Sequence, residues 1–512
     1  MAQYLKGNST QSKSLNVLLL LISLPGIVHR SLALFISVLL LSESVTATPQ
    51  QFSNRSKGGW GEASSFAQQP DATELEATRA AAAQTYQEGV QLFQKGTAES
   101  LQQAITKYEE ALPLFRAVGE KAGEVAVLSN IGEVYFALGE KQKALDFYNQ
   151  SLPLSRAAGD KAAEAVVLNN IGAVYNDLGE KQKALDFFNQ SLPLSRAAGD
   201  KAGEARTLNN IGRVYDDLGE KQKALDFFNQ SLSLSRATGY KAGEAAALSN
   251  IGGVYDNLGE KQKALDFYNQ SLPLNRATGD KTGEAADLSN MGGVYFVLGE
   301  KQKALDFFNQ SLPLSRAAGN KVGEATTLNN IGRVYDDLGE RQKALELYNQ
   351  SLSLRRAAGD KAGEATTLNN ISGVYNDLGE KQKALDFLNQ SLSLRRAAGD
   401  KAGEATTLNN IGRVYDDLGE KQKALDFFNQ SLSLSRVTGD KATEAGILYS
   451  LAYLEGNSNL KEAITHMEAA IKIIEDLRTN IASKELRNSY SATVDSYYQF
   501  YNYLLMQLQR SR

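Results

Sequence analysis

Apolar positions recur with helical spacing along the central part of the chain. In the segment 201–240, the apolar and small residues of the first half fall three or four positions apart: Ala205, Leu208, Ile211, Gly212, Tyr215 and Leu218. The second half repeats this spacing at Ala224, Leu225, Phe228 and Leu232. Such patterns predict two helices, each with one apolar face. Gly219 and Gly239 follow the two patterns and are typical of left-handed helix ends. The segment is therefore predicted to form two antiparallel helices joined by a very short turn.

The same pattern returns every 40 residues from 121 to 440 without a gap, which gives eight near-identical units. A diverged unit precedes them at about 79–120, and another follows at about 441–478. A fixed period of this length indicates an array in which each unit stacks on its neighbours, with diverged units facing water at the ends. No strand pattern occurs in the array, so the predicted fold class is all-α.

Five residues of the unit 201–240 carry a resemblance to a known family. Leu208, Gly212, Tyr215, Ala224 and Phe228 stand at the spacing of the tetratricopeptide repeat motif, and the 40-residue unit resembles the Pins and kinesin-light-chain variety. The resemblance implies a right-handed superhelical solenoid of antiparallel helix pairs over residues 76–478. It also implies a non-catalytic interaction scaffold, whose first helices line a concave groove that holds a partner peptide or helix.

The resemblance places one asparagine of each unit in this groove. These residues are Asn130, Asn170, Asn210, Asn250, Asn290, Asn330, Asn370 and Asn410. A side-chain amide both donates and accepts hydrogen bonds, so a row of amides can hold an extended peptide backbone of any sequence. The alternative is that the asparagines bond to the neighbouring helix, or were copied by recent duplication.

Two further groove positions vary between units and are candidates for specificity. One holds an arginine at Arg213, Arg333 and Arg413, and a guanidinium can bind a carboxylate through two parallel hydrogen bonds. For Arg213 we favour an ion pair with Asp216 or Asp217 of the same helix. The other position holds Phe136 and Phe296, which are candidate apolar anchors or simply pack. The Lys-Gln-Lys cluster that begins each second helix, such as 141–143, is interpreted as a solvated outer face.

The segment 1–47 precedes the array and is predicted to direct export. Residues 15–28 and 31–42 are apolar, are separated by His29 and Arg30, and are followed by small residues near Ala47. This pattern predicts a secretory signal peptide, with a membrane anchor as the alternative. Either one predicts a periplasmic, extracellular or envelope-anchored bacterial protein. Residues 48–75, rich in Gln, Ser and Gly, are predicted to be a flexible linker.

The C-terminal segment 479–512 is rich in tyrosine and predicts an aromatic helix. Together with residues 87–120 it resembles cyanobacterial proteins in which such repeats precede a CHAT domain, a caspase-like cysteine peptidase. The sequence stops where that domain would begin and contains no cysteine to serve as its nucleophile. A second hypothesis is therefore the regulatory part of a split or truncated CHAT peptidase, and a third is a structural spacer in the cell envelope.

Composition narrows the chemistry further. The 512 residues carry 55 basic and 59 acidic side chains, a net charge of −4, with two histidines and no cysteine. Binding of nucleic acid through bulk positive charge is excluded, as are thiolate zinc sites, and histidine-based catalysis or metal binding is not expected. His466 is interpreted as an exposed or capping residue. We expect no enzyme activity, cofactor or metal, and a protein or peptide partner whose identity and effect on oligomeric state stay open.

Overall fold

The computed structural model describes residues 72–510, apart from residue 457 and residues 480–487, 489–490 and 492–493. The predicted signal peptide or membrane anchor (1–47) and the predicted linker up to residue 71 lie outside these residues. No described helix is long and apolar enough to span a membrane.

The described residues form pairs of antiparallel helices and contain no strand. The first helices of the pairs are α3 (Ala72–Lys95), α5 (Lys121–Ala137), α7 (Lys161–Asp177), α9 (Lys201–Asp217), α11 (Lys241–Asn257), α13 (Lys281–Val297), α15 (Lys321–Asp337), α17 (Lys361–Asp377), α19 (Lys401–Asp417) and α21 (Lys441–Glu455). The second helices are α4 (Ala98–Ala117), α6 (Lys141–Ala158), α8 (Lys181–Ala197), α10 (Lys221–Thr238), α12 (Lys261–Thr278), α14 (Lys301–Ala317), α16 (Arg341–Ala357), α18 (Lys381–Ala398), α20 (Lys421–Thr438) and α22 (Leu460–Thr479). A last helix, α24 (Asp495–Arg510), follows them. The all-α repeat array predicted from the sequence is confirmed, and its first helix begins at Ala72 rather than near residue 79.

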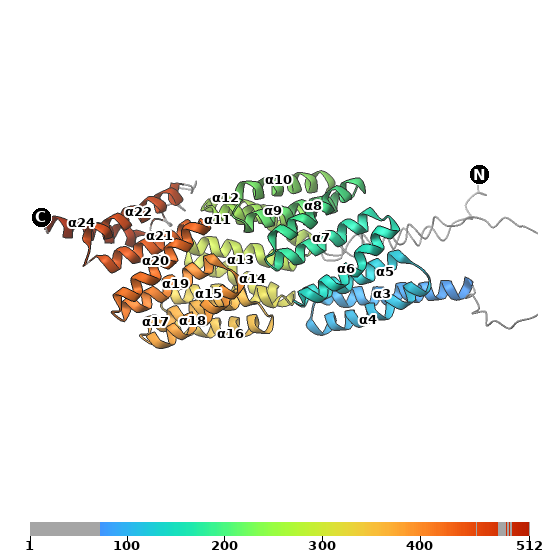
Figure 1. The fold of residues 1–512 in the computed structure, drawn as a ribbon, viewed down its shortest axis with the longest axis horizontal. Helices are drawn as coiled ribbons and strands as arrows, with labels where there is room; N and C mark the ends of the chain where they lie inside the picture. Colours follow the sequence, from blue (N-terminus) through green and yellow to red (C-terminus); the bar gives the residue numbers. More distant parts are fainter. Residues whose placement is uncertain (1–71, 457, 480–487, 489–490, 492–493, 511–512) are drawn as a thin grey trace, which may run out of the picture. The chain divides into compact units, whose positions relative to one another are not determined.

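The chain divides into two compact units, one ending at Thr207 and one beginning at Leu208, both within α9. Within each unit, successive helices pack side by side in chain order (Figure 1). First helices also contact the first helix of the next pair, such as α13 with α15 and α15 with α17. The first helices therefore stand closer together than the second helices, as the resemblance implied for helices that line the inner surface of an array.

Local sequence explains where these helices begin and end. Gly219 has φ +78°, a conformation that only glycine adopts without strain, and the amide of Glu220 then donates to the carbonyl of Tyr215 at 2.9 Å. At the start of α9, the side chain of Asp200 accepts a hydrogen bond from the amide of Gly203 at 2.8 Å. The turn glycine recurs in the other units and the side-chain cap in most of them, so the helices have nearly uniform lengths.

Most helix pairs are held together by the close approach of a glycine to an aromatic ring. A Cβ atom added to Gly212 would lie 2.6 Å from the ring of Phe228, which is buried together with Ala224. In α17 the glycine is replaced by Ser372, and there the facing residue is Leu388 instead of an aromatic residue. The two positions therefore change together, because one cavity accommodates both side chains.

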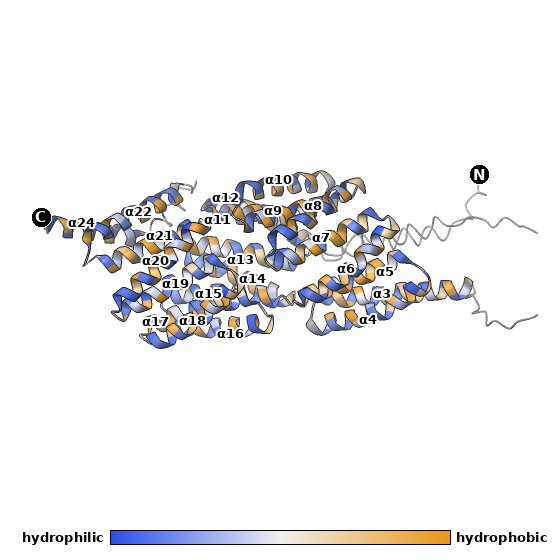
Figure 2. Ribbon diagram, viewed as in Figure 1, coloured by the Kyte–Doolittle hydropathy of each residue, from blue (hydrophilic) through white to orange (hydrophobic). Residues whose placement is uncertain are grey.

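Two residues that the spacing assigned to this core lie elsewhere. Tyr215 is half-buried and stacks on Phe227, with 5.4 Å between ring centroids, while Lys223 lies over its ring. Leu218 is 46% exposed at the turn between the helices. Helical spacing alone does not separate the buried centre of an apolar face from its edge, and both residues lie at that edge. Figure 2 shows hydrophobic and hydrophilic residues alternating along every helix of the array.

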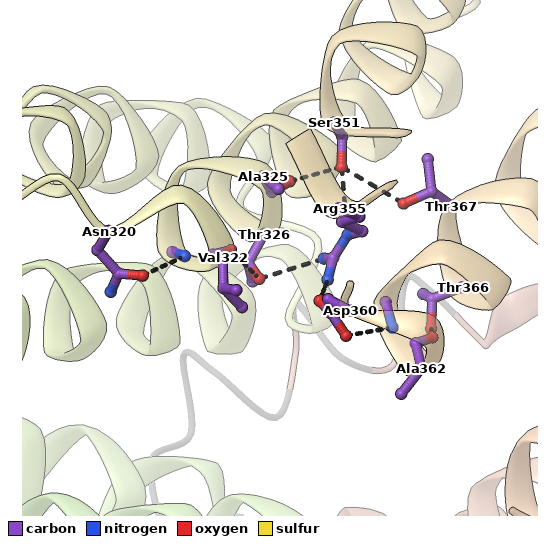
Figure 3. Close-up of polar contacts among 12 residues, drawn as sticks. Asn320, Val322, Ala325, Thr326, Ser351, Arg355, Asp360, Ala362, Thr366 and Thr367 are labelled. Carbon is purple, nitrogen blue, oxygen red and sulfur yellow. Dashed lines mark hydrogen bonds and ion pairs between the residues drawn. The ribbon is translucent and has the colours of Figure 1, made fainter. Parts of the chain in front are cut away.

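A layer of buried polar groups adds a second contact within each pair. The hydroxyl of Ser351 on α16 donates to the carbonyl of Ala325 on α15 at 2.8 Å, and equivalent serines do so in other units. One turn further along α16, Arg355 replaces the serine found in most units. Its buried guanidinium donates to Asp360, the cap of α17, at 2.5 Å and to Thr326 on α15 at 3.1 Å (Figure 3). Arg355 thereby connects three helices.

Asp287 on α13 is the most deeply buried carboxylate of this layer. It accepts hydrogen bonds from Ser249 at 2.7 Å and from Asn275 at 2.8 Å. Thr327, Thr367 and Thr407 occupy the same position in the next units. Burial raises the pKa of Asp287 to about 6, although Ser271, Ser249 and Asn275 oppose this shift by hydrogen bonding.

The end of the array is covered by the aromatic helix. Tyr497 and Phe500 of α24 pack on Tyr449 of α21, and Leu504 is fully buried. His466 on α22 is neither fully exposed nor a cap. Its Nδ1 atom lies 2.9 Å from a carboxylate oxygen of Glu455, at the end of α21. The five array prolines lie inside second helices, as their positions predicted.

Gly212→Ser is expected to destabilise the chain by about 1–3 kcal/mol, because the new side chain collides with Phe228. Adding Phe228→Leu recreates the Ser372–Leu388 pair. The double variant should therefore lose less stability than the two single variants together, by more than about 0.5 kcal/mol. Urea unfolding followed by circular dichroism measures this. Gly293→Ser is the control, since nothing lies within 4 Å of a Cβ at that position. Strict additivity would contradict the shared cavity.

Gly363→Ala is expected to destabilise the chain by about 1–3 kcal/mol, because its Cβ would overlap the guanidinium of Arg355. Gly203→Ala changes the same position in a unit where Ser195 replaces the arginine, and Ala163 already stands there in another unit. The Cβ of Gly203→Ala would meet no arginine but only the movable carboxylate end of Asp200, so this variant should lose less stability than Gly363→Ala. Thermal melts of the two variants compare them, and an equal loss at both sites would show that the arginine is not the cause.

Asp287→Asn is expected to make the second unit more stable relative to wild type as the pH rises. A carboxylate whose folded pKa is raised stabilises the fold below its unfolded pKa near 3.8, and this contribution is lost as the pH passes about 6. The shift corresponds to roughly 3 kcal/mol. Hydrogen–deuterium exchange of peptides from α12 and α13, compared between variant and wild type at pH 4 and pH 7, tests this. Asp306→Asn, at an exposed carboxylate, is the control.

Candidate functional site

The asparagines predicted to line the groove form contacts between neighbouring first helices. The amide nitrogen of Asn250 donates to the side-chain oxygen of Asn209 at 3.0 Å, across from α11 to α9. Asn370 donates to Asn329 at 3.0 Å, and Asn410 donates to Asn369 at 3.2 Å. The bonds to a neighbouring helix that the sequence left as an alternative are therefore present. Contact of these amides with a partner stays a prediction.

The other five asparagines have differing surroundings. Asn130 is buried and donates to the hydroxyls of Tyr86 at 2.9 Å and Tyr108 at 3.4 Å in the first helix pair. Burial raises the pKa of both tyrosines. Asn170 and Asn210 are also buried, Asn330 is half-buried, and Asn290 is exposed. Near-identical sequence positions thus differ in their access to a partner.

A cavity of about 570 Å³ lies along the first helices α13, α15, α17 and α19 of the second unit. It brings together five of the predicted partner-binding residues: Phe296, Arg333, Asn370, Asn410 and Arg413. Asp336, Asp337, Asp377 and Arg341 complete its charged lining. The five residues come from the first helices of four successive units, so only stacking of the units brings them together.

Arg333 and Phe296 form a direct contact in this cavity. The guanidinium carbon of Arg333 lies 4.9 Å from the centre of the Phe296 ring, a cation–π geometry between α15 and α13. The Arg333 side chain has exposed surface, yet the surrounding protein lowers its pKa through desolvation. An arginine held on an aromatic ring at the wall of a cavity keeps its donors available to an incoming acceptor.

The remaining predicted residues lie away from this cavity. Arg213 and its neighbour Asp216 are on α9, where Asp216 pairs with Lys221 of α10 at 2.7 Å. Asp216, one of the two carboxylates proposed for Arg213, is therefore engaged by a lysine of the next helix, and pairing with Asp217 stays a prediction. Phe136 is half-buried and packs against the hydrophobic core of the first unit, as the alternative for this residue predicted.

Sequence analysis missed a row of cations at the edge of the first helices. In most units the first lysine of the Lys-Gln-Lys cluster does not simply face solvent. Lys221 and Lys261 reach back to Asp216 and Asp256 at 2.7 and 2.6 Å. Where the acceptor is replaced by Phe136 or Phe296, the lysine instead reaches forward to the next unit. Lys141 then contacts Asp177 at 2.6 Å, and Lys301 contacts Asp337 at 2.5 Å. The signal available in the sequence was the five-residue spacing between acid and lysine.

A second cavity, of about 1400 Å³, is lined by the turns after α9 and α11 and by helices α20 and α22. None of the predicted partner-binding residues lies in its wall. Among the described residues, no group of three or more His, Cys, Asp or Glu side chains is arranged to hold a metal ion. The cavity along α13–α19 is therefore the candidate site.

Comparisons with known proteins agree with this architecture. The sequence profile described as Tetratricopeptide repeat matches residues 97–157, 163–237, 284–357 and 363–436, and a second profile of that description matches residues 245–278. A search of curated proteins found no match.

Two solved structures share the fold at low sequence identity. One is a Rap protein complexed with Competence and Sporulation Factor, with 14% identity and a TM-score of 0.54, covering 72% of this chain and 99% of that one. The other is the apo form of the quorum sensor NprR from B. thuringiensis, with 17% identity and a TM-score of 0.50, covering 70% and 99%. Since the matched repeats span more than half of its length, the chain belongs to the tetratricopeptide repeat family.

Proposed function

We propose that this chain is a non-catalytic scaffold that binds an extended peptide segment of a partner protein along helices α13, α15, α17 and α19. The observation that carries the proposal is the cavity in which Phe296, Arg333, Asn370, Asn410 and Arg413 converge. Its volume of about 570 Å³ lies within the usual range for ligand pockets, about 300–1,000 Å³. A solved Rap protein of similar fold holds Competence and Sporulation Factor, which supports a binding role for an array of this kind.

The amides of the cavity retain capacity for a peptide. A side-chain amide offers two donors and one oxygen with two acceptor positions. The donation from Asn370 to Asn329 uses one donor of Asn370, and the donation from Asn410 to Asn369 uses one donor of Asn410. These bonds also fix the orientation of the amides before a ligand arrives, which lowers the entropy lost on binding.

The charged residues of the cavity would fix the direction in which the peptide runs and the register in which its residues meet the helices. Arg333, on the Phe296 ring, and Arg413 lie on α15 and α19, two units apart. A backbone bound to the amides between them would present carboxylate or carbonyl oxygens to either guanidinium. Export of the chain, predicted from residues 1–47, is part of the same proposal, as is a partner outside the cytoplasm.

The double variant Arg333→Gln with Arg413→Gln tests the site. We expect dodecamer peptides, selected by phage display on the immobilised full chain, to bind it about ten- to a hundredfold more weakly than wild type, because two charge-assisted contacts are removed. Fluorescence anisotropy with the selected peptides measures the affinity.

The control is Arg236→Gln with Arg276→Gln, which removes two arginines paired with Glu244 and Glu284. Exposed ion pairs contribute little to stability, so this variant should bind like wild type. Equal binding by both double variants, or the absence of any selected peptide, would contradict the proposed function and favour a structural spacer.

A further inference from the structure

One carboxylate in the wall of the cavity has a buried oxygen that no hydrogen-bond donor of the protein reaches. Asp216 and Asp256 each pair with the lysine five residues later, and Asn176 and Asn376 accept from Lys181 and Lys381 in the same way. Asp336 stands at this position in α15. Its Oδ1 atom is buried and accepts no hydrogen bond from the protein.

A single substitution within the array accompanies this missing donor. The residue five positions after Asp336 is Arg341, the only arginine among the eight near-identical units at a position that is otherwise lysine. Its guanidinium reaches forward and donates to Asp377 of the next unit at 2.8 Å. Its Nε atom is also buried without a hydrogen-bond acceptor. The side chain of Arg341 thus pairs with Asp377 of the neighbouring unit and donates no hydrogen bond to the Oδ1 atom of Asp336.

The other charges of the cavity do not compensate Asp336. Asp337 pairs with Lys301, and Asp377 pairs with Arg341. Arg333 lies over the ring of Phe296. The positive charge of Arg413 is one of the causes that lower the pKa of Asp417 on the same helix. Burial and the nearby Asp377 raise the pKa of Asp336, and the charge of Arg341 opposes this shift only in part. A buried acceptor without a donor is costly, and a cationic donor would remove this cost.

We propose that Asp336 selects peptides carrying a lysine or arginine side chain, whose charged N–H group binds the Oδ1 atom of Asp336 inside the cavity. This inference rests on the proposed function, because the rest of the peptide is held by the surrounding amides and arginines. The cation takes the place that the lysine ammonium occupies beside Asp216 and Asp256. Selectivity then arises from a buried acceptor in the cavity wall that receives no hydrogen bond from the protein.

Two substitutions that copy other units of the array test the proposal. Arg341→Lys restores the residue that pairs with Asp216 and Asp256, so an intramolecular ammonium should occupy Asp336. Asp336→Asn removes the charge and reproduces Asn176 and Asn376. Both changes are native elsewhere in the chain, so both variants should fold, and thermal melts verify this. Asp306→Asn removes an equal charge from an exposed site on α14 and is the matched control.

The experiment is selection of random dodecamer peptides on the full-length wild type and on each variant. We expect lysine or arginine to be enriched at one peptide position with wild type and with Asp306→Asn. This enrichment should disappear with Arg341→Lys and with Asp336→Asn, and a basic peptide selected on wild type should bind these two about ten- to a hundredfold more weakly. Replacing its basic residue with norleucine should remove the difference between the proteins.

The outcomes separate the two proposals. Selected peptides without a basic preference, or a preference that survives both Arg341→Lys and Asp336→Asn, would overturn the role of Asp336 and leave peptide binding intact. Failure to select any peptide on wild type would overturn the proposed function and this inference with it.

Discussion

The structure depends on how closely the two helices of each pair approach one another. That distance is set where a glycine of the first helix faces a buried ring of the second, as Gly212 faces Phe228 with no room for a Cβ atom. Ridges of one helix then enter grooves of the other, and the buried alanine beside the ring completes the contact. Because nearly every unit uses the same contact, the units have nearly the same shape, and regular stacking follows. Ser372 and Leu388 show that the constraint is one of shared volume rather than of a fixed residue pair.

Regular stacking brings equivalent residues of successive first helices into a row. Side chains of neighbouring units then form hydrogen bonds and ion pairs along this row. Asparagine amides form hydrogen bonds from one unit to the next. Lysines at the turns contact an acceptor in their own unit, as Lys221 does, or in the next unit, as Lys141 does. These contacts are weak individually, since most are partly exposed. Their effect is to fix side-chain orientation along the surface that a partner would meet.

The proposed binding site is built from irregularities of the array. Phe296 replaces an acid, redirects Lys301 and supplies a ring on which Arg333 rests. Arg341 replaces a lysine and leaves Asp336 with an unsatisfied oxygen. Both departures fall in adjoining units and line one cavity. A repeated scaffold tolerates such changes because the glycine–ring contacts of these units, Gly292 with Phe308 and Gly332 with Tyr348, are retained.

The sequence by itself determined the helix pairs, their 40-residue period, the glycine turns and most buried positions, because these depend on spacing along one chain. It also identified the residues Arg333, Arg413, Phe296, Asn370 and Asn410 as partner-binding candidates, although it could not say that these five, among thirteen, share a cavity. Tyr215, Leu218 and the partner of Asp216 were assigned differently from what the structure shows, since each depends on a neighbour across a turn or in another helix. Only the tertiary structure decided which carboxylate oxygen lacks a hydrogen-bond donor. The hydrogen bonds of Asp336 and Arg341 depend on distances between units, and the spacing of residues within one unit carries no information about those distances.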